Sequence, residues 1–415
     1  MNFKFNKIIS NIINILICEV IIFGNGKWSE YYFGFNLRKT LFVFLILFLL
    51  IYLYKYNLNK RFLQLISIPA GAFLLWALVV PFANGISLYH SISEGSIMIG
   101  FLILPLIVKF YLINKNLWEL NKKWILLSLI ILSLSHIILA LALTNLFPGS
   151  ELILDFYSNI LNPAKDSSLN LNNTDSEIRV GWISSVFLLM MAVSPFLFNM
   201  NNVIKLLIVL ITILALYFNG QRGIYFAALY SGLCATFLYF IIKNNVRILI
   251  KYFFSISVIL AVIIIFFASN PIFLEYIGFS RPLSDDIRFS QSSILLNEFS
   301  QHSLIGKGFG STSQEIDRPE ASPYSFEQFL LSMLMKTGLL GVLAFILYNI
   351  IWQSCLEKRS VFSLNSDEIK KYCTLFFLIT FIFCASTSNP YLFNFVGIVY
   401  IYIVTVEYLV LLEKK

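Results

Sequence analysis

Residues 203–243 read VIKLLIVLITILALYFNGQRGIYFAALYSGLCATFLYFIIK, and this stretch decides the fold class. It holds two apolar runs, 203–219 and 223–243, on either side of a short polar turn. Each run has roughly the 20 residues that an α-helix needs to cross about 30 Å of hydrocarbon. The stretch therefore predicts two membrane-spanning helices joined by a tight hairpin at one membrane surface.

The rest of the chain repeats this pattern over 415 residues. Hydrophobic residues make up 58% of it and charged residues only 13%, which excludes a soluble domain of this size. We expect an all-α polytopic membrane protein, with residues 1–415 as a single membrane domain of about twelve transmembrane helices. The expected spans are 7–23, 40–55, 62–81, 93–113, 124–147, 181–199, 203–219, 223–243, 250–268, 326–352, 372–388 and 390–412.

The net charge of +8 reports membrane topology rather than a nucleic-acid partner. Most lysines and arginines fall in short loops on the side that holds both termini, and this bias places both termini in the cytoplasm. The chain has no basic tail or aromatic-lined basic groove for a nucleic acid. Arg38 and Lys39 conflict with the assignment, because they would lie outside.

Arg222 lies in the turn between the helices predicted at 203–219 and 223–243, where an arginine is costly unless it has a partner. The flanking Gly220 and Gly223 let the backbone turn sharply and let a ligand approach closely. The helix that begins here adds free N–H groups and a dipole that favour an anion. We interpret Arg222 as part of an anion site; the alternative is an arginine that snorkels to the interface.

Two long loops, residues 148–180 and 269–325, are expected on the same outer side as Arg222. Long loops on a membrane scaffold often carry function. Arg179 ends the first loop and Arg288 lies in the second. Three guanidinium groups on one face would form a clamp for a diphosphate. Taken singly, Arg179 and Arg288 are as readily explained as solvated or loop-bracing charges.

The segment IRFSQSSILLNEFSQH, residues 287–302, is expected to form a helix at the membrane interface. Positions 288, 295 and 299 share one helical stripe. Arg288 therefore faces the same way as Leu295 and Phe299, toward protein or lipid rather than water.

Glu327 lies at the outer mouth of a span, where it is either a general base or the ion-pair partner of an arginine. Lys336 lies within the same span and needs a partner that the sequence does not identify. His136, inside an apolar helix, is expected to be a packed and hydrogen-bonded residue. His302 and Lys307, in the second loop, are candidates for substrate binding or for a structural role. The histidines lack the spacing of a metal site, so we expect no metal.

Three motifs, in this order, resemble those of the O-antigen polymerase and O-antigen ligase superfamily. They are NGQRG at 219–223, HSLIGKGFG at 302–310, and Glu327-Gln328 separated by nine residues from GLLG at 338–341. The resemblance covers roughly residues 179–350. Ligases typically carry a histidine and a polar residue where Glu327-Gln328 stands, which favours a Wzy-type polymerase. Gln221 also replaces the serine often found before the arginine.

The resemblance implies a GT-C-like fold and a cofactor-free, metal-independent inverting glycosyltransferase in the bacterial inner membrane. Its substrate would be an undecaprenyl-diphosphate-linked oligosaccharide, as donor and as acceptor, polymerised on the periplasmic face into O-antigen-like polysaccharide for lipopolysaccharide. Membrane lipids and a chain-length regulator protein are the other implied partners. The site residues that it implies are Arg222, Arg288 and Glu327 for catalysis, and Arg179, Gln221, His302 and Lys307 for substrate binding.

Two alternatives remain open. An O-antigen ligase would transfer the finished glycan to lipid A core or to a protein. A non-enzymatic flippase or transporter for lipid-linked glycans would place ionisable residues along a path through the membrane. Lys336 and Glu19, both within apolar spans, favour that alternative.

Overall fold

The computed structural model describes residues 2–24, 27–55, 71, 73–145, 148–161, 169–174, 177–198, 200–243, 282–313, 316, 326–354, 356, 359–387, 389 and 391–413. The expected span 250–268 and half of the expected span 62–81 lie outside these ranges.

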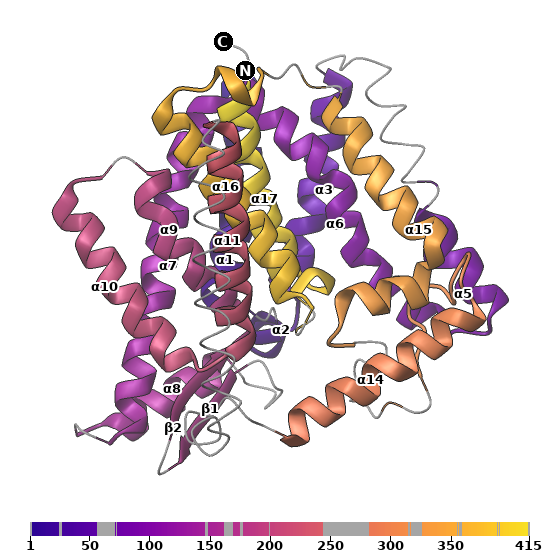
Figure 1. Cartoon of the computed structure of the whole chain (residues 1–415), viewed down its shortest axis with the longest axis horizontal. Coiled ribbons are helices and arrows are strands. Elements are labelled where there is room, and N and C mark those ends of the chain that lie inside the picture. The colour runs from indigo at the N-terminus through magenta and orange to yellow at the C-terminus, as the bar shows by residue number, and fades with distance from the viewer. Residues whose placement is uncertain are drawn as a thin grey trace.

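The described part of the chain is helical except for one β-hairpin (Figure 1). The elements up to the hairpin are α1 (Asn2–Phe23), α2 (Lys27–Phe33), α3 (Leu37–Lys55), the π-helical η1 (Leu75–Val79), α5 (Val80–Ala83), α6 (Leu88–Ile113), α7 (Lys115–Leu143) and α8 (Ser150–Leu161). The hairpin consists of β1 (Leu169–Thr174) and β2 (Glu177–Trp182). The later elements are η2 (Ile183–Val186), α9 (Phe187–Leu197), α10 (Asn202–Asn219), α11 (Arg222–Ile242), α14 (Pro282–Gln301), α15 (Phe329–Ser354), η3 (Val361–Ser363), α16 (Ser366–Ala385), η4 (Tyr391–Phe393) and α17 (Phe395–Leu412).

Eight of the described helices are long and apolar enough to cross a membrane: α1, α3, α6, α7, α10, α11, α15 and α17. Each falls on an expected span, so the chain is a polytopic membrane protein, as its composition predicts. The finer count of about twelve spans stays a prediction.

The expected span 181–199 is wrong at its start, because residues up to Trp182 form strand β2. This strand pairs antiparallel with β1 and places Arg179 opposite Asn172. An apolar run of this length does not by itself distinguish a strand from a helix. The neighbouring strand decides here, since it supplies the backbone partners that β2 needs. Helix α9 follows and is only 11 residues long.

Helix α17 lies at the centre of the bundle, packed against α1, α6 and α16. It is apolar on nearly every side, with Glu407 as its one charged residue, and 78% of its span is buried. Helix α11, with 17% of its span buried, lies at the periphery against α16.

The two termini lie at the same end of the molecule (Figure 1). The β-hairpin, α8 and α14 lie at the opposite end. This arrangement matches the expectation that both termini share one side while the two long loops share the other. The cytoplasmic assignment of the termini stays a prediction.

Arg38, which conflicts with the charge bias, is a buried structural residue. Its Nε and Nη2 donate to the two carboxylate oxygens of Glu19 at 2.8 and 3.1 Å, and Nη1 donates to the carbonyl oxygen of Gly24 at 3.0 Å. Trp28 Nε1 donates a further hydrogen bond of 2.9 Å to Glu19. Paired in this way, Arg38 joins α1 to α3 and carries little weight as a topology signal.

Candidate active site opposite the termini

The hairpin between α10 and α11 forms as the sequence predicts. Helix α10 ends at Gly220, whose φ of 59° and ψ of 15° give the left-handed cap that glycine adopts readily. Gln221 is extended and precedes Arg222, the first residue of α11. The Gln221 Oε1 atom accepts a hydrogen bond of 2.9 Å from the hydroxyl of Tyr391 in η4. The turn is thereby fixed to the connection between α16 and α17.

The side chains of Arg222 and Arg179 lie outside the described part of the structure, whereas their backbones are placed. Strand β2, which carries Arg179, packs against α7 and α10. His136 of α7 fixes the end of this strand, with its Nε2 2.8 Å from Ser185 Oγ and its ring stacked on Trp182. His136 is therefore the packed, hydrogen-bonded residue that the sequence predicts. The backbone of Arg179 thus belongs to a strand packed on the helix that leads into the Arg222 turn.

The structure brings Arg288 and Glu327 together. Arg288 Nε lies 3.0 Å from Glu327 Oε2, and about a third of each side chain is exposed, 34% and 31%. Gln328 Nε2 donates to the Arg288 carbonyl oxygen at 2.8 Å, and the Glu327 backbone N–H donates to Gln291 Oε1 at 3.1 Å. Of the two roles open to Glu327, the ion pair is the one formed in this structure. The flanking amide contacts hold α14 against the start of α15.

Helix α14 presents the face that its sequence predicts. Leu295 is fully buried and packs with Phe326 and Met335, and Phe299 lies against the same cluster. Arg288, on the same stripe, therefore points toward α15 rather than into water. This stripe is what places the guanidinium of Arg288 beside Glu327.

The glycine-rich segment 302–310 and the GLLG motif form a single structural unit. Helix α15 breaks at Gly338, whose φ is 63° and ψ is −172°. The segment fills the break, since Lys307 N and Gly308 N donate to the Met335 and Lys336 carbonyl oxygens at 2.9 and 2.7 Å. Backbone groups that a broken helix leaves unpaired are satisfied in this way.

His302 begins that unit, and Lys307 lies within it. Lys307 Nζ forms an ion pair of 3.1 Å with Glu298 of α14. His302 is half-buried just after α14, where its backbone N–H donates to Phe299 at 3.0 Å. Their predicted roles in substrate binding remain predictions.

Lys336 has a buried partner that sequence reasoning missed. Its Nζ forms an ion pair with Glu94 Oε1, and the side chains of Lys336 and Glu94 are only 0% and 2% exposed. Glu94 lies in α6, far away in the sequence. Each is a charged residue within an apolar helix, and such residues usually pair with one another. That rule was the available signal, although it does not select a partner among the acids of the chain.

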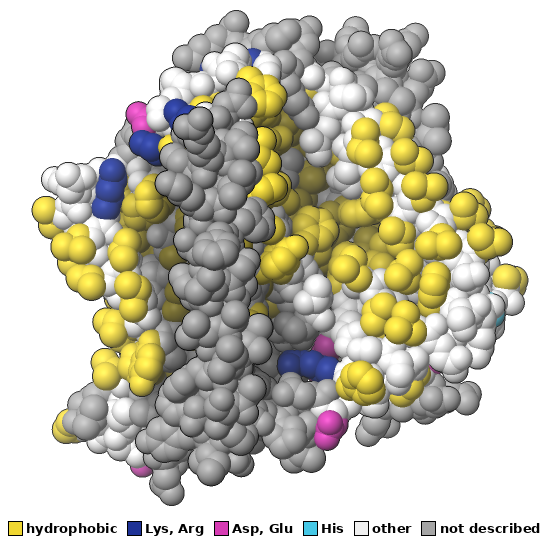
Figure 2. Space-filling model, in the orientation of Figure 1, with side chains coloured by type: hydrophobic (Ala, Val, Ile, Leu, Met, Phe, Trp, Pro, Cys, Tyr) yellow, Lys and Arg dark blue, Asp and Glu magenta, His cyan; other side chains and the backbone are white. Residues whose placement is uncertain are grey.

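The Arg222 turn and the Arg288–Glu327 pair both border the connection between α16 and α17. Tyr391 of that connection binds Gln221, and Phe329 N, two residues after Glu327, donates to the Ser386 carbonyl oxygen at 3.1 Å. Figure 2 shows this face hollowed between α15 and α17, with apolar side chains along the hollow. Basic and acidic side chains lie together at its lower rim, near α14.

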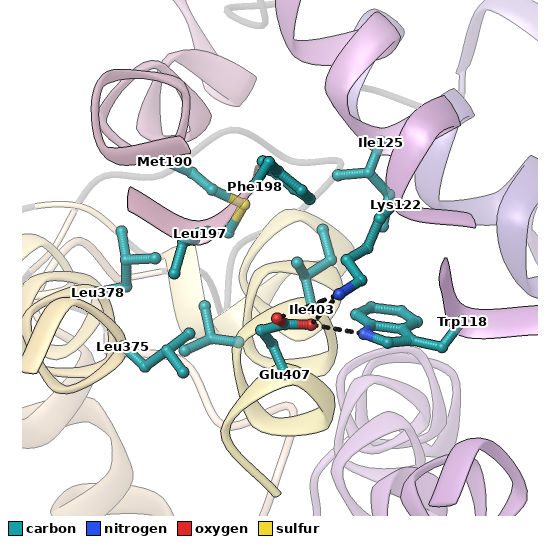
Figure 3. Close-up of a pocket in the computed structure, with 11 residues that line it drawn as sticks. Trp118, Lys122, Ile125, Met190, Leu197, Phe198, Leu375, Leu378, Ile403 and Glu407 are labelled. Carbon is teal, nitrogen blue, oxygen red and sulfur yellow. Dashed lines mark hydrogen bonds and ion pairs between the residues drawn. The ribbon is translucent and has the colours of Figure 1, made fainter. Parts of the chain in front are cut away.

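A second charged cluster lies near the opposite end of α17 (Figure 3). Glu407 accepts from Trp118 Nε1 at 2.6 Å and pairs with Lys122 and Lys371. The adjoining cavity measures about 10 Å³, room for no more than one water molecule. The two lysines and the indole neutralise and satisfy the buried carboxylate. We therefore interpret the cluster as a clamp between α7, α16 and α17.

Residues 207–346 match the family model described as O-antigen ligase (Wzy_C). This segment is an O-antigen ligase family domain. It spans Arg222, Arg288, Glu327 and the glycine-rich unit, which confirms the family resemblance of those motifs. Enzymes of this family transfer glycans and act on lipid-linked glycans in membranes. No curated protein matches the chain.

Proposed function

We propose that this protein polymerises undecaprenyl-diphosphate-linked oligosaccharide repeat units on the periplasmic face of the bacterial inner membrane. The transfer is inverting and independent of a metal. The observation that carries the proposal is the ion pair between Arg288 and Glu327 within the family domain. The Nε atom of Arg288 lies 3.0 Å from the Oε2 atom of Glu327. Glu327 stands where the superfamily resemblance places a histidine in ligases, which favours a polymerase.

The guanidinium groups stabilise the leaving group. As the bond between the anomeric carbon and the diphosphate oxygen breaks, its electron pair stays with the diphosphate. Positively charged groups already in place stabilise this growing charge with little reorganisation. We assign this role to Arg222 and Arg288, with Arg179 assisting from β2. Gln221, His302 and Lys307 contact the glycan or the lipid phosphates.

Glu327 acts on the acceptor. A hydroxyl of the second lipid-linked repeat attacks the anomeric carbon, and Glu327 takes the proton that this hydroxyl loses. Such a base contributes about 10²–10⁴-fold in rate. Because an inverting attack comes from the face opposite the leaving group, the Arg288–Glu327 pair must open to admit the sugar. The incoming diphosphate drives this opening, since it offers Arg288 more negative charge than one carboxylate does.

An O-antigen ligase is the second candidate, favoured by the description of the matched family model. It would use the same diphosphate clamp with lipid A core or a protein as acceptor. The transporter alternative loses its motivation, because Lys336 and Glu19 are each held in a local ion pair within the described structure.

An assay of the purified protein in proteoliposomes, with lipid-linked repeats and no other acceptor, distinguishes these functions. We expect a ladder of glycan lengths by gel electrophoresis and mass spectrometry. Transfer only after addition of lipid A core or an acceptor protein would identify a ligase. Movement of the lipid across the bilayer with no new glycosidic bond would identify a transporter and overturn the proposal.

A further inference from the structure

The buried pair of Glu94 and Lys336 takes no part in the chemistry proposed above, yet it contacts the segments that carry the reacting residues. Its contacts extend in two directions. The Glu94 Oε2 atom accepts a hydrogen bond of 2.6 Å from Gly310 N, in the segment that follows α14. The Lys336 ammonium lies 4.9 Å from the centre of the Phe326 ring.

Phe326 connects this pair to the candidate base. It directly precedes Glu327, and its ring is fully buried between Leu295 of α14 and Met335 of α15. An ammonium group over an aromatic face is attracted by the negative charge of that face. The Lys336 ammonium thus holds the ring of Phe326, the residue next to Glu327, in place.

The backbone of Lys336 holds the segment that follows the C-terminal end of α14. Its carbonyl oxygen accepts from Gly308 N at 2.7 Å, and its C and O atoms lie close beneath Gly306. Together with the hydrogen bond from Gly310, these contacts fasten the segment that ends α14. One end of the Arg288–Glu327 bridge is therefore held through Phe326 and the other through residues 302–310.

We propose that the Glu94–Lys336 pair is a positioning device that fixes α14 over the start of α15 and so sets the geometry between Arg288 and Glu327. Its consequence for glycan transfer rests on the proposed function; its consequence for the placement of α14 does not. Charged groups suit this task because their contacts with Gly310 and Phe326 are directional. Two apolar side chains would fill the same space without fixing either neighbour.

The double variant Glu94→Leu with Lys336→Met tests this inference, because it removes the ion pair and also the acceptor for Gly310 N. Replacing a buried ion pair by hydrophobic residues of similar volume is often neutral for stability. Hydrogen–deuterium exchange is measured for α14 and residues 302–310, with the central helix α17 as the internal reference. We expect exchange in α14 to quicken by about tenfold or more while α17 keeps its protection.

Chain growth is measured on the same preparations. We expect a loss of about 10²-fold in kcat, the usual consequence of a displacement of about 1 Å at a reacting centre. The matched control, Glu19→Leu with Arg38→Met, removes the buried pair between α1 and α3 and should leave α14 exchange unchanged. If the double variant does not fold, Phe326→Leu serves in its place. It keeps the ion pair but removes the ring, and exchange in α14 should again become faster.

Each outcome decides the inference. Wild-type exchange in α14 of the folded double variant, or of Phe326→Leu, would overturn it. Equal loosening of α14 and α17 would also overturn it, since that marks a general loss of stability. Loosened α14 with unchanged chain growth would overturn the catalytic consequence. If the wild-type protein forms no glycosidic bond, the proposed function fails, whereas the exchange data still decide whether the pair positions α14.

Discussion

Among the single residues, Arg222 has the proposed role that depends most on the exact chemistry of its side chain. A guanidinium can bind two phosphate oxygens at once, whereas an ammonium acts as a point charge. We therefore expect Arg222→Lys to lose most of its chain-growth activity, by about 10–10²-fold, or 1.5–3 kcal/mol of transition-state binding. The measurement is the glycan-length distribution from purified lipid-linked repeats. Arg359→Lys, near the termini, changes the same residue type and should grow normal chains; normal chains from Arg222→Lys would refute its role.

The sequence identifies charged side chains that are costly to bury in apolar spans, but it does not identify their partners. The helical stripe of α14 predicts where Arg288 faces, since it depends only on local periodicity. By contrast, Glu94 and Lys336 meet across 242 positions of sequence, and Arg38 meets Glu19 on another helix. Such pairings depend on tertiary packing, which a single sequence does not encode in any local pattern.

At the scale of elements, the broken helix α15 and the glycine-rich segment should act as one unit. A Cβ at Gly306 would lie 2.4 Å from the Lys336 carbonyl carbon, while one at Gly85 would meet nothing within 4 Å. Both glycines have a similar positive φ, 76° and 69°. We expect Gly306→Ala to destabilise the protein by about 1–3 kcal/mol more than Gly85→Ala, because only the first adds overpacking.

Thermal unfolding in detergent measures this difference as a lower Tm for Gly306→Ala. The two alanine variants share the cost of a strained backbone, so that cost cancels in the comparison. Equal Tm values would show that the segment is loosely held and does not complete the break in α15.

Helix positions follow from the sequence wherever an apolar run stands between polar turns. The expected span 203–219 falls on α10, and 223–243 falls on α11. The prediction is wrong at 181, because Glu177–Trp182 pair with a polar partner strand, LNLNNT. That partner alternates leucine and asparagine only over residues 169–172, a weak strand signal that the longer apolar run from residue 180 onward outweighs.

For the whole molecule, the charge bias predicts which end faces the periplasm. Phe289 on α14 and Phe362 on η3 are similarly exposed, 79% and 76%, near opposite ends of the molecule. In a cysteine-free background, a membrane-impermeant maleimide added to intact spheroplasts should label Phe289→Cys and spare Phe362→Cys. The reverse pattern would invert the topology and place the candidate site in the cytoplasm.

The role of Glu327 as the base is tested most directly by the rate and length of chain growth that Glu327→Gln supports from purified lipid-linked repeats. We expect a loss of about 10²–10⁴-fold in the rate of chain growth, because the amide cannot take the acceptor proton. Glu151→Gln, an exposed change on α8 at the same end, should grow chains as the wild type does. Chains of normal length and rate from Glu327→Gln would contradict the role assigned to the Arg288–Glu327 pair.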